Sequence, residues 1–180
     1  MSAEGVRLRR FSRRHVGLLV KASHDAEIVR WTFIPPDLDN AGAAALAERW
    51  LSRAADGRLR QYVISAGEST PAEGLVSLVL QDRDDAWLAD VVYWLLPQGR
   101  RRGLVTRAVR LMLNWAFERG GVRRAALYTK EGNVPSDRVA ERSGFRYTGT
   151  VHRQRGEQQL MLRRWLLDPA EHSARPDAEC

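Results

Sequence analysis

The chain has 180 residues, of which 44% are apolar and 28% charged, so it has an ordinary globular composition and is long enough for one domain with a sizeable core. Lysine and arginine total 29 against 22 aspartate and glutamate, and the net charge of +7 favours anionic partners without choosing between nucleic acid, phosphorylated cofactors and acidic proteins. The single cysteine, Cys180, excludes an intrachain disulfide framework and a cysteine metal site, and the longest strongly apolar run, "VVYWLL" at 91–96, is too short to span a bilayer.

The first half of the chain predicts three strands and two helices. The segment "VRLRRF" (6–11) alternates and predicts a first strand. Ser12 is a suitable N-cap, and a helix is expected from there to about Trp31, since "PP" at 35–36 excludes its continuation. The remaining expected elements are a helix over 39–57 closed by Gly57, strands over 60–67 and 73–82, and a hairpin turn at "DRDD" (82–85).

The second half is organised around a long strand and a long helix. The strand covers 87–97, ends at Pro97, and has an unbroken apolar half that indicates burial on both faces. A helix of about 16 residues follows Gly103 and ends at "GG" (120–121). Its apolar residues are spaced 4, 3 and 4 apart: Leu104, Ala108, Leu111 and Trp115. The remaining expected elements are a strand over 123–129, a short helix from Pro135 to Gly144, and final strands in 145–152 and 158–167.

These elements predict a single domain over residues 1–167. The last residues, 168–180, lack apolar periodicity and contain two prolines, so a flexible tail is expected there. The N-terminus has no apolar run of signal-peptide length. We therefore expect a cytoplasmic protein without a membrane segment.

The stretch "QGRRRGLVTRAV" (98–109) lies between the long strand and the long helix. Gly103 stands where the strand has ended and the helix begins, so unpaired backbone N–H groups and the positive end of the helix dipole coincide there. Arg100, Arg101 and Arg102 add cations. This arrangement recurs in pyrophosphate sites, although the stretch also fits a solvated basic turn or a nucleic-acid patch. The sequence has no GxxxxGK[ST] and no GxGxxG motif, which argues against a P-loop or a dinucleotide site.

A second motif, "NVPSDRVAERSGF" (133–145), begins thirty residues after Gly103. Together the two segments resemble the GNAT superfamily of acyl-CoA-dependent N-acyltransferases, most closely the branch of bacterial ribosomal-protein N-terminal (Rim-type) acetyltransferases. The family's pyrophosphate signature, Q/R-x-x-G-x-G/A, reads Arg100-x-x-Gly103-x-Val105 here. The branch's second signature, N-x-x-S-x-x-[VA]-x-x-x-x-G-F, is matched by Asn133, Ser136, Val139, Gly144 and Phe145. The resemblance implies an α+β fold with a mixed, mostly antiparallel central sheet of about six to seven strands and about four flanking helices.

Three positions depart from the family pattern. Arg101 stands where glycine is common, Val105 where glycine or alanine is common, and Arg107 where glutamate is often seen. The larger side chains at the first two positions either crowd a bound pyrophosphate or point away from it, and the sequence leaves both alternatives open.

The resemblance implies that acetyl-CoA, or another short acyl-CoA, is the co-substrate and that no metal ion takes part. Asn133 would bind the pantetheine arm, and Ser136 would donate a proton to the departing thiolate. Ordinary helix-start roles stay open for Thr106, Asn133 and Ser136. The pyrophosphate would lie on the loop and the first helical turn, at Arg100, Arg101, Arg102, Gly103, Leu104, Val105 and Thr106.

The implied reaction needs a neutral amine, so a base that removes a proton is expected, directly or through water. Asp90 is the first candidate, because it interrupts an apolar strand where related enzymes often carry an acid; the alternative is an edge-strand acid facing solvent. His152 is the second candidate, with a surface histidine as its alternative. Glu157 is near the place of a glutamate found in this branch but does not align with it. Without a base, the enzyme would rely on positioning an amine that is already neutral.

Trp31, Phe33 and Tyr93 are the candidates for lining the acceptor pocket, with core packing as the alternative. His24 and Asp25 are expected near the opening of the same acceptor pocket. The acceptor would be a primary amine of a protein N-terminus or a small molecule, and the positive charge suits an acidic protein or the ribosome better than a polycationic aminoglycoside. Dimers are common among members of this superfamily, so a homodimer stays open. The alternative function is a non-catalytic module that binds acyl-CoA or RNA through the arginine-rich loop.

Overall fold

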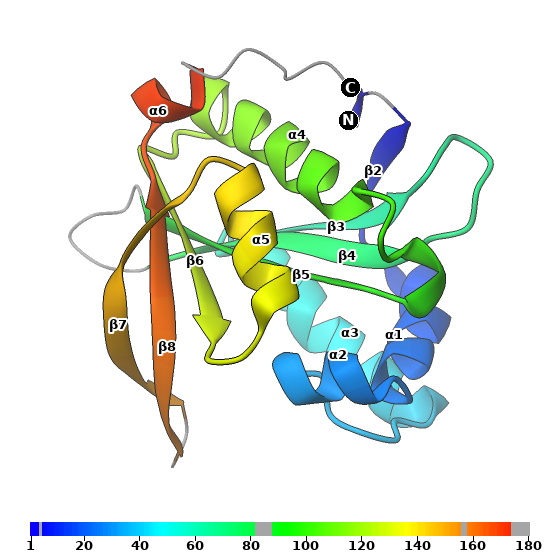
Figure 1. Ribbon diagram of the computed structural model, residues 1–180. Coiled ribbons are helices and arrows are strands. Elements are labelled where there is room, and N and C mark those ends of the chain that lie inside the picture. Colours follow the sequence, from blue (N-terminus) through cyan, green and yellow to red (C-terminus); the bar gives the residue numbers. More distant parts are fainter. Residues whose placement is uncertain (4, 82–87, 156–157, 174–180) are drawn as a thin grey trace.

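One mixed β-sheet runs through the described part of the chain. A computed structural model describes residues 1–3, 5–81, 88–155 and 158–173. The strand order is β1-β2-β3-β4-β5-β6-β8-β7, and every neighbouring pair is antiparallel except β5 and β6 (Figure 1). The strands are β1 (Ser2–Ala3), β2 (Val6–Arg10), β3 (Leu59–Ser65), β4 (Gly74–Leu80), β5 (Leu88–Leu95), β6 (Arg124–Lys130), β7 (Arg146–Arg155) and β8 (Gln158–Leu167). The predicted mixed, mostly antiparallel sheet is confirmed, and it has eight strands because the two residues of β1 pair with β2.

The parallel pair of strands separates partway along its length. Its ladder runs from the pairing of Leu88 with Arg124 to that of Val91 with Leu127. Beyond that point β5 keeps pairing with β4 as far as Leu95, whereas β6 pairs with β8. Figure 1 shows β5 continuing toward α4 while β6 turns away toward the loop before α5. The splay therefore opens one strand face to solvent, and Val92 is 40% exposed where burial on both faces was expected.

Helices cover both faces of the sheet. In Figure 1, α1, α2 and α3 lie on one side and α4 and α5 on the other, and each group packs on its own apolar cluster. The structure has more helices than the four expected, because the first predicted helix is divided and a short helix follows β8. The helices are α1 (Val16–Ser23), α2 (Ala26–Trp31), α3 (Asn40–Ala55), α4 (Leu104–Glu118), α5 (Val134–Arg142) and α6 (Pro169–Ser173), besides the short 3-10 turns at Arg13–His15 and Pro97–Gly99.

The first predicted helix is divided at His24 and Asp25. Asp25 has an extended backbone, and its carboxylate accepts a hydrogen bond from the N–H of Ile28 at 2.8 Å. Aspartate is among the preferred N-cap residues, so this contact starts a new helix instead of prolonging the first. The division turns α2 so that Trp31 at its end reaches the loop after β6, beside Gly132.

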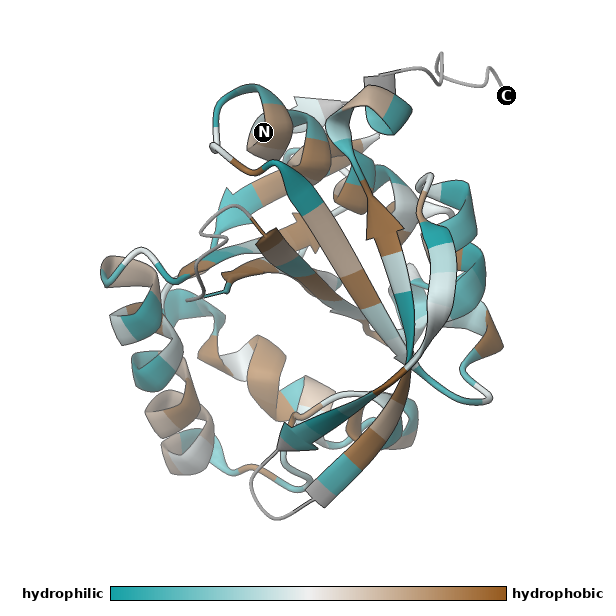
Figure 2. Cartoon of the chain, turned by 90° about the vertical axis from the view of Figure 1, so that its left-hand side faces the viewer, coloured by the Kyte–Doolittle hydropathy of each residue, from teal (hydrophilic) through white to brown (hydrophobic). Residues whose placement is uncertain are grey.

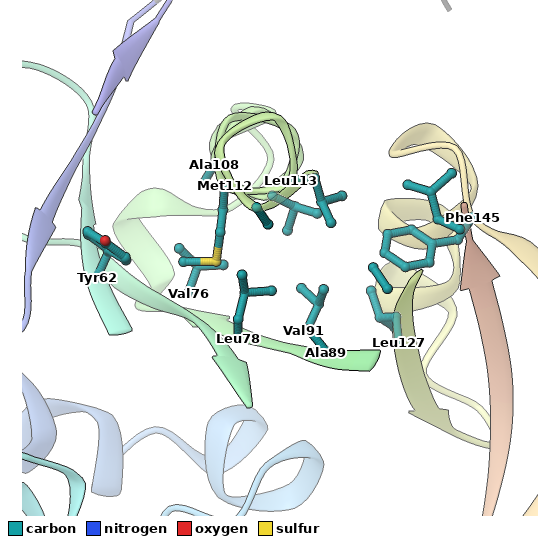
Figure 3. Packing of buried hydrophobic residues seen from close by; sticks show 14 of the residues in the cluster. Tyr62, Val76, Leu78, Ala89, Val91, Ala108, Met112, Leu113, Leu127 and Phe145 are labelled. Carbon is teal, nitrogen blue, oxygen red and sulfur yellow. The ribbon is translucent and has the colours of Figure 1, made fainter. Parts of the chain in front are cut away.

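Helix α4 packs along the sheet with the wide apolar face that its spacing predicts. Ala108, Met112 and Leu113 are completely buried, and Figure 3 shows them above Val76 and Leu78 of β4. Full burial of a large apolar side chain contributes about 1.5–3 kcal/mol. Figure 2, seen from the side of β7 and β8, shows apolar stretches on the strands between the helix layers. This packing fixes the position at which α4 begins.

Two predicted features lie partly or wholly outside the described residues. The hairpin turn at 82–85 is outside them, and so are residues 174–180 of the predicted tail. The first part of that tail forms α6, where Glu171 pairs with Arg146 and the ring of His172 packs on Phe117 at 5.3 Å. Among the described helices, none is both long and apolar enough to cross a membrane.

Candidate active site

The loop between β5 and α4 leaves the start of α4 without a side-chain cap. After the 3-10 turn η2 (Pro97–Gly99), the chain reaches Gly103, which is the N-cap residue and has a φ of +66°. Glycine cannot accept a hydrogen bond through a side chain, so the first-turn N–H groups of α4 receive no cap from it. A row of backbone donors therefore lies at the positive end of the helix dipole, next to the splayed end of β5.

Two of the three loop arginines bind carboxylates of the protein itself. Arg100 donates to the Asp25 carboxylate at 2.5 Å and to the carbonyl of Leu95 at 3.1 Å. Arg102 donates to both carboxylate oxygens of Glu73, at 3.0 and 3.2 Å. These ion pairs tie the loop to α2 and to the segment before β4. The cluster of cations expected from Arg100 to Arg102 therefore serves in part to hold the loop before α4 in place.

The two bulky residues of the loop point away from the row of donors or into solvent. Arg101 is exposed and has a φ of +61°, a region that favours glycine, which accounts physically for the glycine common at this position in the family. Val105 packs against the core cluster around α4, and Leu104 is fully buried in it. Thr106 is half-buried in the first turn. Of the two alternatives left open by the sequence, the geometry favours side chains that leave the donors uncovered.

Arg107 folds back over the loop. Its Nη2 donates to the carbonyl of Arg102 at 3.0 Å, and its Nη1 lies 3.1 Å from the place that a Cβ on Gly103 would occupy. Its Nε is buried and has no hydrogen-bond partner among the described residues. A guanidinium in the first turn of a helix is unfavourable next to the positive helix end unless an anion is also present. This charge arrangement is therefore suited to an anionic ligand.

The first turn of α5 meets β5 through a pair of hydroxyl groups. Asn133 is the N-cap residue, and its side-chain oxygen accepts from the Ser136 N–H at 3.3 Å. The Ser136 hydroxyl lies 2.6 Å from the Tyr93 hydroxyl, which comes from the splayed part of β5. Burial raises the pKa of Tyr93, and hydrogen bonding to Ser136 opposes this only in part. The structure thus brings together Ser136 and Tyr93, which the sequence placed in different parts of the site.

A network of polar side chains holds this turn of α5 from behind. Asp137 accepts from the Thr129 hydroxyl of β6 at 2.6 Å, and Thr129 in turn accepts from the Trp165 indole at 3.2 Å. Arg163 of β8 lies 3.2 Å from the other Asp137 oxygen. These contacts join α5 to two strands, so the position of Ser136 is set by residues on both sides of the motif that contains it.

Asp90 lies in the interior of the sheet. It sits on β5 between β4 and β6, one residue before the ladder ends, and is 7% exposed. One carboxylate oxygen, Oδ2, accepts from Arg153 at 2.7 Å and from the Gln81 amide, while the other, Oδ1, is buried without a hydrogen-bond partner among the described residues. Burial raises the pKa of Asp90, and Arg153 and Gln81 oppose that increase. The alternative of a solvent-facing acid on an edge strand is wrong, because β5 has a neighbour on each side.

His152 is exposed and is not brought to Asp90. It precedes Arg153 on β7, and successive residues of a strand point to opposite faces, so the two side chains diverge. His152 pairs across the hairpin with the exposed Met161. Glu157 lies outside the described residues.

Trp31 and Phe33 meet at the end of β6, apart from Tyr93. The Trp31 ring is 3.9 Å from the place of a Cβ on Gly132, and Lys130 lies 5.6 Å above the Phe33 ring. Lys130 also donates to the carbonyl of Arg30 at 2.7 Å. By strand alternation Lys130 shares a face of the sheet with Tyr128 and Ala126, and Ala126 pairs with Asp90. Trp31 and Phe33 therefore border the face that carries Asp90, whereas Tyr93 points to the face of α4 and α5.

Sequence reasoning missed Arg153 and the support that Asp137 receives. Both depend on the register of the final strands, and residue type alone gives no signal of it. Among the described residues, no group of three or more His, Cys, Asp and Glu side chains is placed to hold a metal ion.

Two sequence comparisons match parts of this chain to known proteins. Residues 6–146 match the sequence model of a domain family described as acetyltransferase (GNAT) domain. A stretch of 72 residues is 33% identical to the "Putative ribosomal N-acetyltransferase YdaF" of Bacillus subtilis (strain 168), covering 40% of this chain and 39% of that protein.

Solved structures share the fold over nearly the whole chain. RimL, a ribosomal L7/L12 alpha-N-protein acetyltransferase solved with coenzyme A, superposes with a TM-score of 0.78 at 15% identity over 92% of this chain and 95% of its own. A spermidine N-acetyltransferase from Vibrio cholerae, solved with CoA and spermine, gives a TM-score of 0.78 at 17% identity over 94% of this chain and 98% of its own. At these identities the likeness shows a common fold.

Proposed function

The chain belongs to the acetyltransferase (GNAT) domain family, and from that premise we propose that it is an N-acetyltransferase that transfers an acetyl group from acetyl-CoA to a primary amine. The observation that carries this proposal is the uncapped start of α4, where Gly103 leaves the first-turn N–H groups without a side-chain acceptor beside the splayed strands. Several proteins with the same fold, RimL and the spermidine acetyltransferase among them, were solved with CoA.

The cofactor-binding role belongs to the loop and the two helix starts. Backbone N–H groups from Arg101 to Thr106 bind the pyrophosphate, helped by the helix dipole and by the Arg107 guanidinium. Arg100 and Arg102 act mainly by fixing the loop through Asp25 and Glu73. Asn133, at the start of α5, binds the pantetheine arm. Acetyl-CoA supplies an activated acyl group; other short acyl-CoA molecules fit the same groups.

Ser136, hydrogen-bonded to Tyr93, supplies the proton for the leaving sulfur. Their hydroxyls are 2.6 Å apart, and Tyr93 has a raised pKa, so its proton stays in place at neutral pH and stabilises the hydroxyl pair. When the amine nitrogen bonds to the acyl carbon and the carbon–sulfur bond breaks, the sulfur takes the hydroxyl proton of Ser136. Tyr93 keeps its own proton and stabilises the Ser136 oxygen through their hydrogen bond, and solvent returns a proton to Ser136 in exchange for the amine proton that Asp90 has taken.

Asp90 is the base for the incoming amine. Its buried Oδ1 has no hydrogen-bond partner among the described residues, and its raised pKa makes it a better proton acceptor than an ordinary aspartate. His152 is the weaker candidate because it is exposed and faces away from Asp90. Trp31 and Phe33 border the acceptor, which is a protein N-terminus or a small-molecule amine.

Calorimetry tests the proposal against the alternative of an RNA-binding module. We expect acetyl-CoA to bind with a modest salt dependence and a panel of amines and N-terminal peptides to release free thiol. Binding of a short RNA alone, with an affinity that falls steeply between two salt concentrations, would contradict the proposal. The pairing of Arg100 and Arg102 with carboxylates weighs against the RNA alternative, because these cations are already partly neutralised.

A further inference from the structure

Arg153 lies between the Asp90 carboxylate and solvent. It reaches from β7 to β5, donates to Asp90 at 2.7 Å, and stacks on the Tyr128 ring at 3.9 Å. The Arg153 side chain is 35% exposed and that of Asp90 10%. An amine that approaches Asp90 from the Trp31 and Phe33 side therefore meets the guanidinium as part of the site.

The charge balance at this ion pair restricts which amines can bind. A protonated amine beside Asp90 places two cations on one carboxylate, whether Arg153 stays in contact or moves aside. The excess positive charge is only partly solvated, so it is costly, and the contact of Arg153 with the Tyr128 ring offsets only part of that cost. A second negative group, supplied by the acceptor itself, removes the excess by pairing with Arg153.

Other cations border the same face of the sheet. Lys130 lies over Phe33, and Arg30 stacks on the Trp31 ring at 4.4 Å. Arg164 pairs across the strands with Tyr128, so it shares the face on which Arg153 stacks. These groups attract an anionic ligand and repel one with several positive charges.

We propose that Arg153 is a specificity-determining residue, an inference that rests on the proposed function. The acceptor is a peptide N-terminus with an acidic side chain within its first two or three residues. Asp90 receives the amine and Arg153 the acidic group, so the resting ion pair is exchanged for two ion pairs with the substrate. Polyamines lack the second group and are poor acceptors.

Binding of matched peptides tests this assignment. Three peptides share the first residue and carry glutamate, glutamine or lysine at the second, and they are titrated calorimetrically into the protein in the presence of CoA, which cannot react. We expect the glutamate peptide to bind about tenfold or more tightly than the lysine peptide. Arg153→Gln should abolish the preference, and Arg153→Lys should keep part of it.

A control separates the local contact from the net charge. Arg49 is exposed on α3, so Arg49→Gln makes the same charge change away from this face and should leave the preference intact. Equal affinity for the three peptides, or a preference that survives Arg153→Gln, would overturn the inference. Thiol release from acetyl-CoA is measured separately with the three peptides and spermine. Release at similar rates from all of them refutes only the specificity assigned here, whereas release from none of them and from none of the wider panel of amines and N-terminal peptides refutes the proposed function.

Discussion

The helix-start region, formed by the loop before α4 and the first turn of α5, and the acceptor face, with Asp90, Arg153 and Lys130, are built by different contacts. In the helix-start region, the contacts that begin each helix are local: the Gly103 carbonyl accepts from the Arg107 N–H and the Asn133 side chain from the Ser136 N–H, three or four residues away. Longer-range pairs, such as Arg100 with Asp25, only hold these helix starts in place. On the acceptor face, Asp90 and Arg153 are 63 residues apart, and Lys130 and Arg30 are 100 apart.

The two regions differ in which substitutions they tolerate. Local backbone geometry tolerates few residue types, so the helix starts are recognisable as motifs. Long-range side-chain pairs only require that two strands stay in register, and many residue types at the strand positions are compatible with that register. We therefore expect substitutions in the helix-start region to alter cofactor binding or turnover, and substitutions on the acceptor face to alter stability and acceptor choice.

The largest effect is expected from Gly103→Glu. A carboxylate at this position would lie at the pyrophosphate site, and two unit charges about 4 Å apart near a surface repel by about 4 kcal/mol, so acetyl-CoA affinity should fall by at least about 100-fold in calorimetry. Gly103→Ala is the control, because it shares the strain of a positive φ and its Cβ meets only the flexible end of Arg107. If the two variants bound acetyl-CoA with similar affinity, the loss of affinity would come from the strained backbone at residue 103, and the pyrophosphate assignment would be refuted.

Ser136→Ala should separate chemistry from binding in the same region. Loss of a proton donor lowers kcat by about 10²-fold, while acetyl-CoA affinity should change little because Asn133 and the loop remain. Tyr93→Phe should show a smaller decrease in kcat, since Ser136 keeps its own proton. Steady-state kinetics with calorimetry provides the measurement. A parallel loss of affinity and kcat would instead mean that Ser136 only shapes the first turn of α5.

On the acceptor face, Asp90→Asn should change stability in a pH-dependent way. Loss of the ion pair leaves Arg153 without its partner and costs about 1–2 kcal/mol of unfolding free energy, less than a fully buried pair because Arg153 is partly exposed.

The sign of the pH effect follows from the raised pKa of Asp90. The folded state binds this proton more tightly than the unfolded chain, so the contribution of Asp90 is largest below its ordinary pKa and falls as pH rises through the higher folded value. Urea unfolding from about pH 4 to 7 should therefore show wild type losing stability relative to Asp90→Asn. The opposite slope would mean that Arg153 outweighs burial.

The smallest effect is expected from Arg101→Gly. Glycine adopts the positive φ without strain but makes the unfolded chain more flexible, so the net gain should be about 0.5–1 kcal/mol in urea unfolding. Arg101→Ala removes the same side chain and keeps the strain, so it should bring no gain. If both variants gained equally, the benefit would come from removing charge from the loop.

Most of the fold was predictable because its elements have strong periodic patterns and clear ends. The alternating strands, the 4-3-4 spacing of α4 and the glycines that end helices act locally, and each appears at about the expected place. The division of the first helix was missed because the Asp25 cap competes with a continuous apolar pattern, and its Arg100 partner lies 75 residues away.

By itself, the sequence determined the helix-start region. Gly103, Asn133 and Ser136 are specified by backbone conformations and hydrogen bonds within one turn, which leave a readable pattern of residue types. Only the tertiary structure decided that Tyr93 joins Ser136, that Asp90 lies between two strands rather than at an edge, and that Arg153 covers it. Strand order and register set these contacts, and both arise from packing of the whole sheet, which residue types along one segment do not encode.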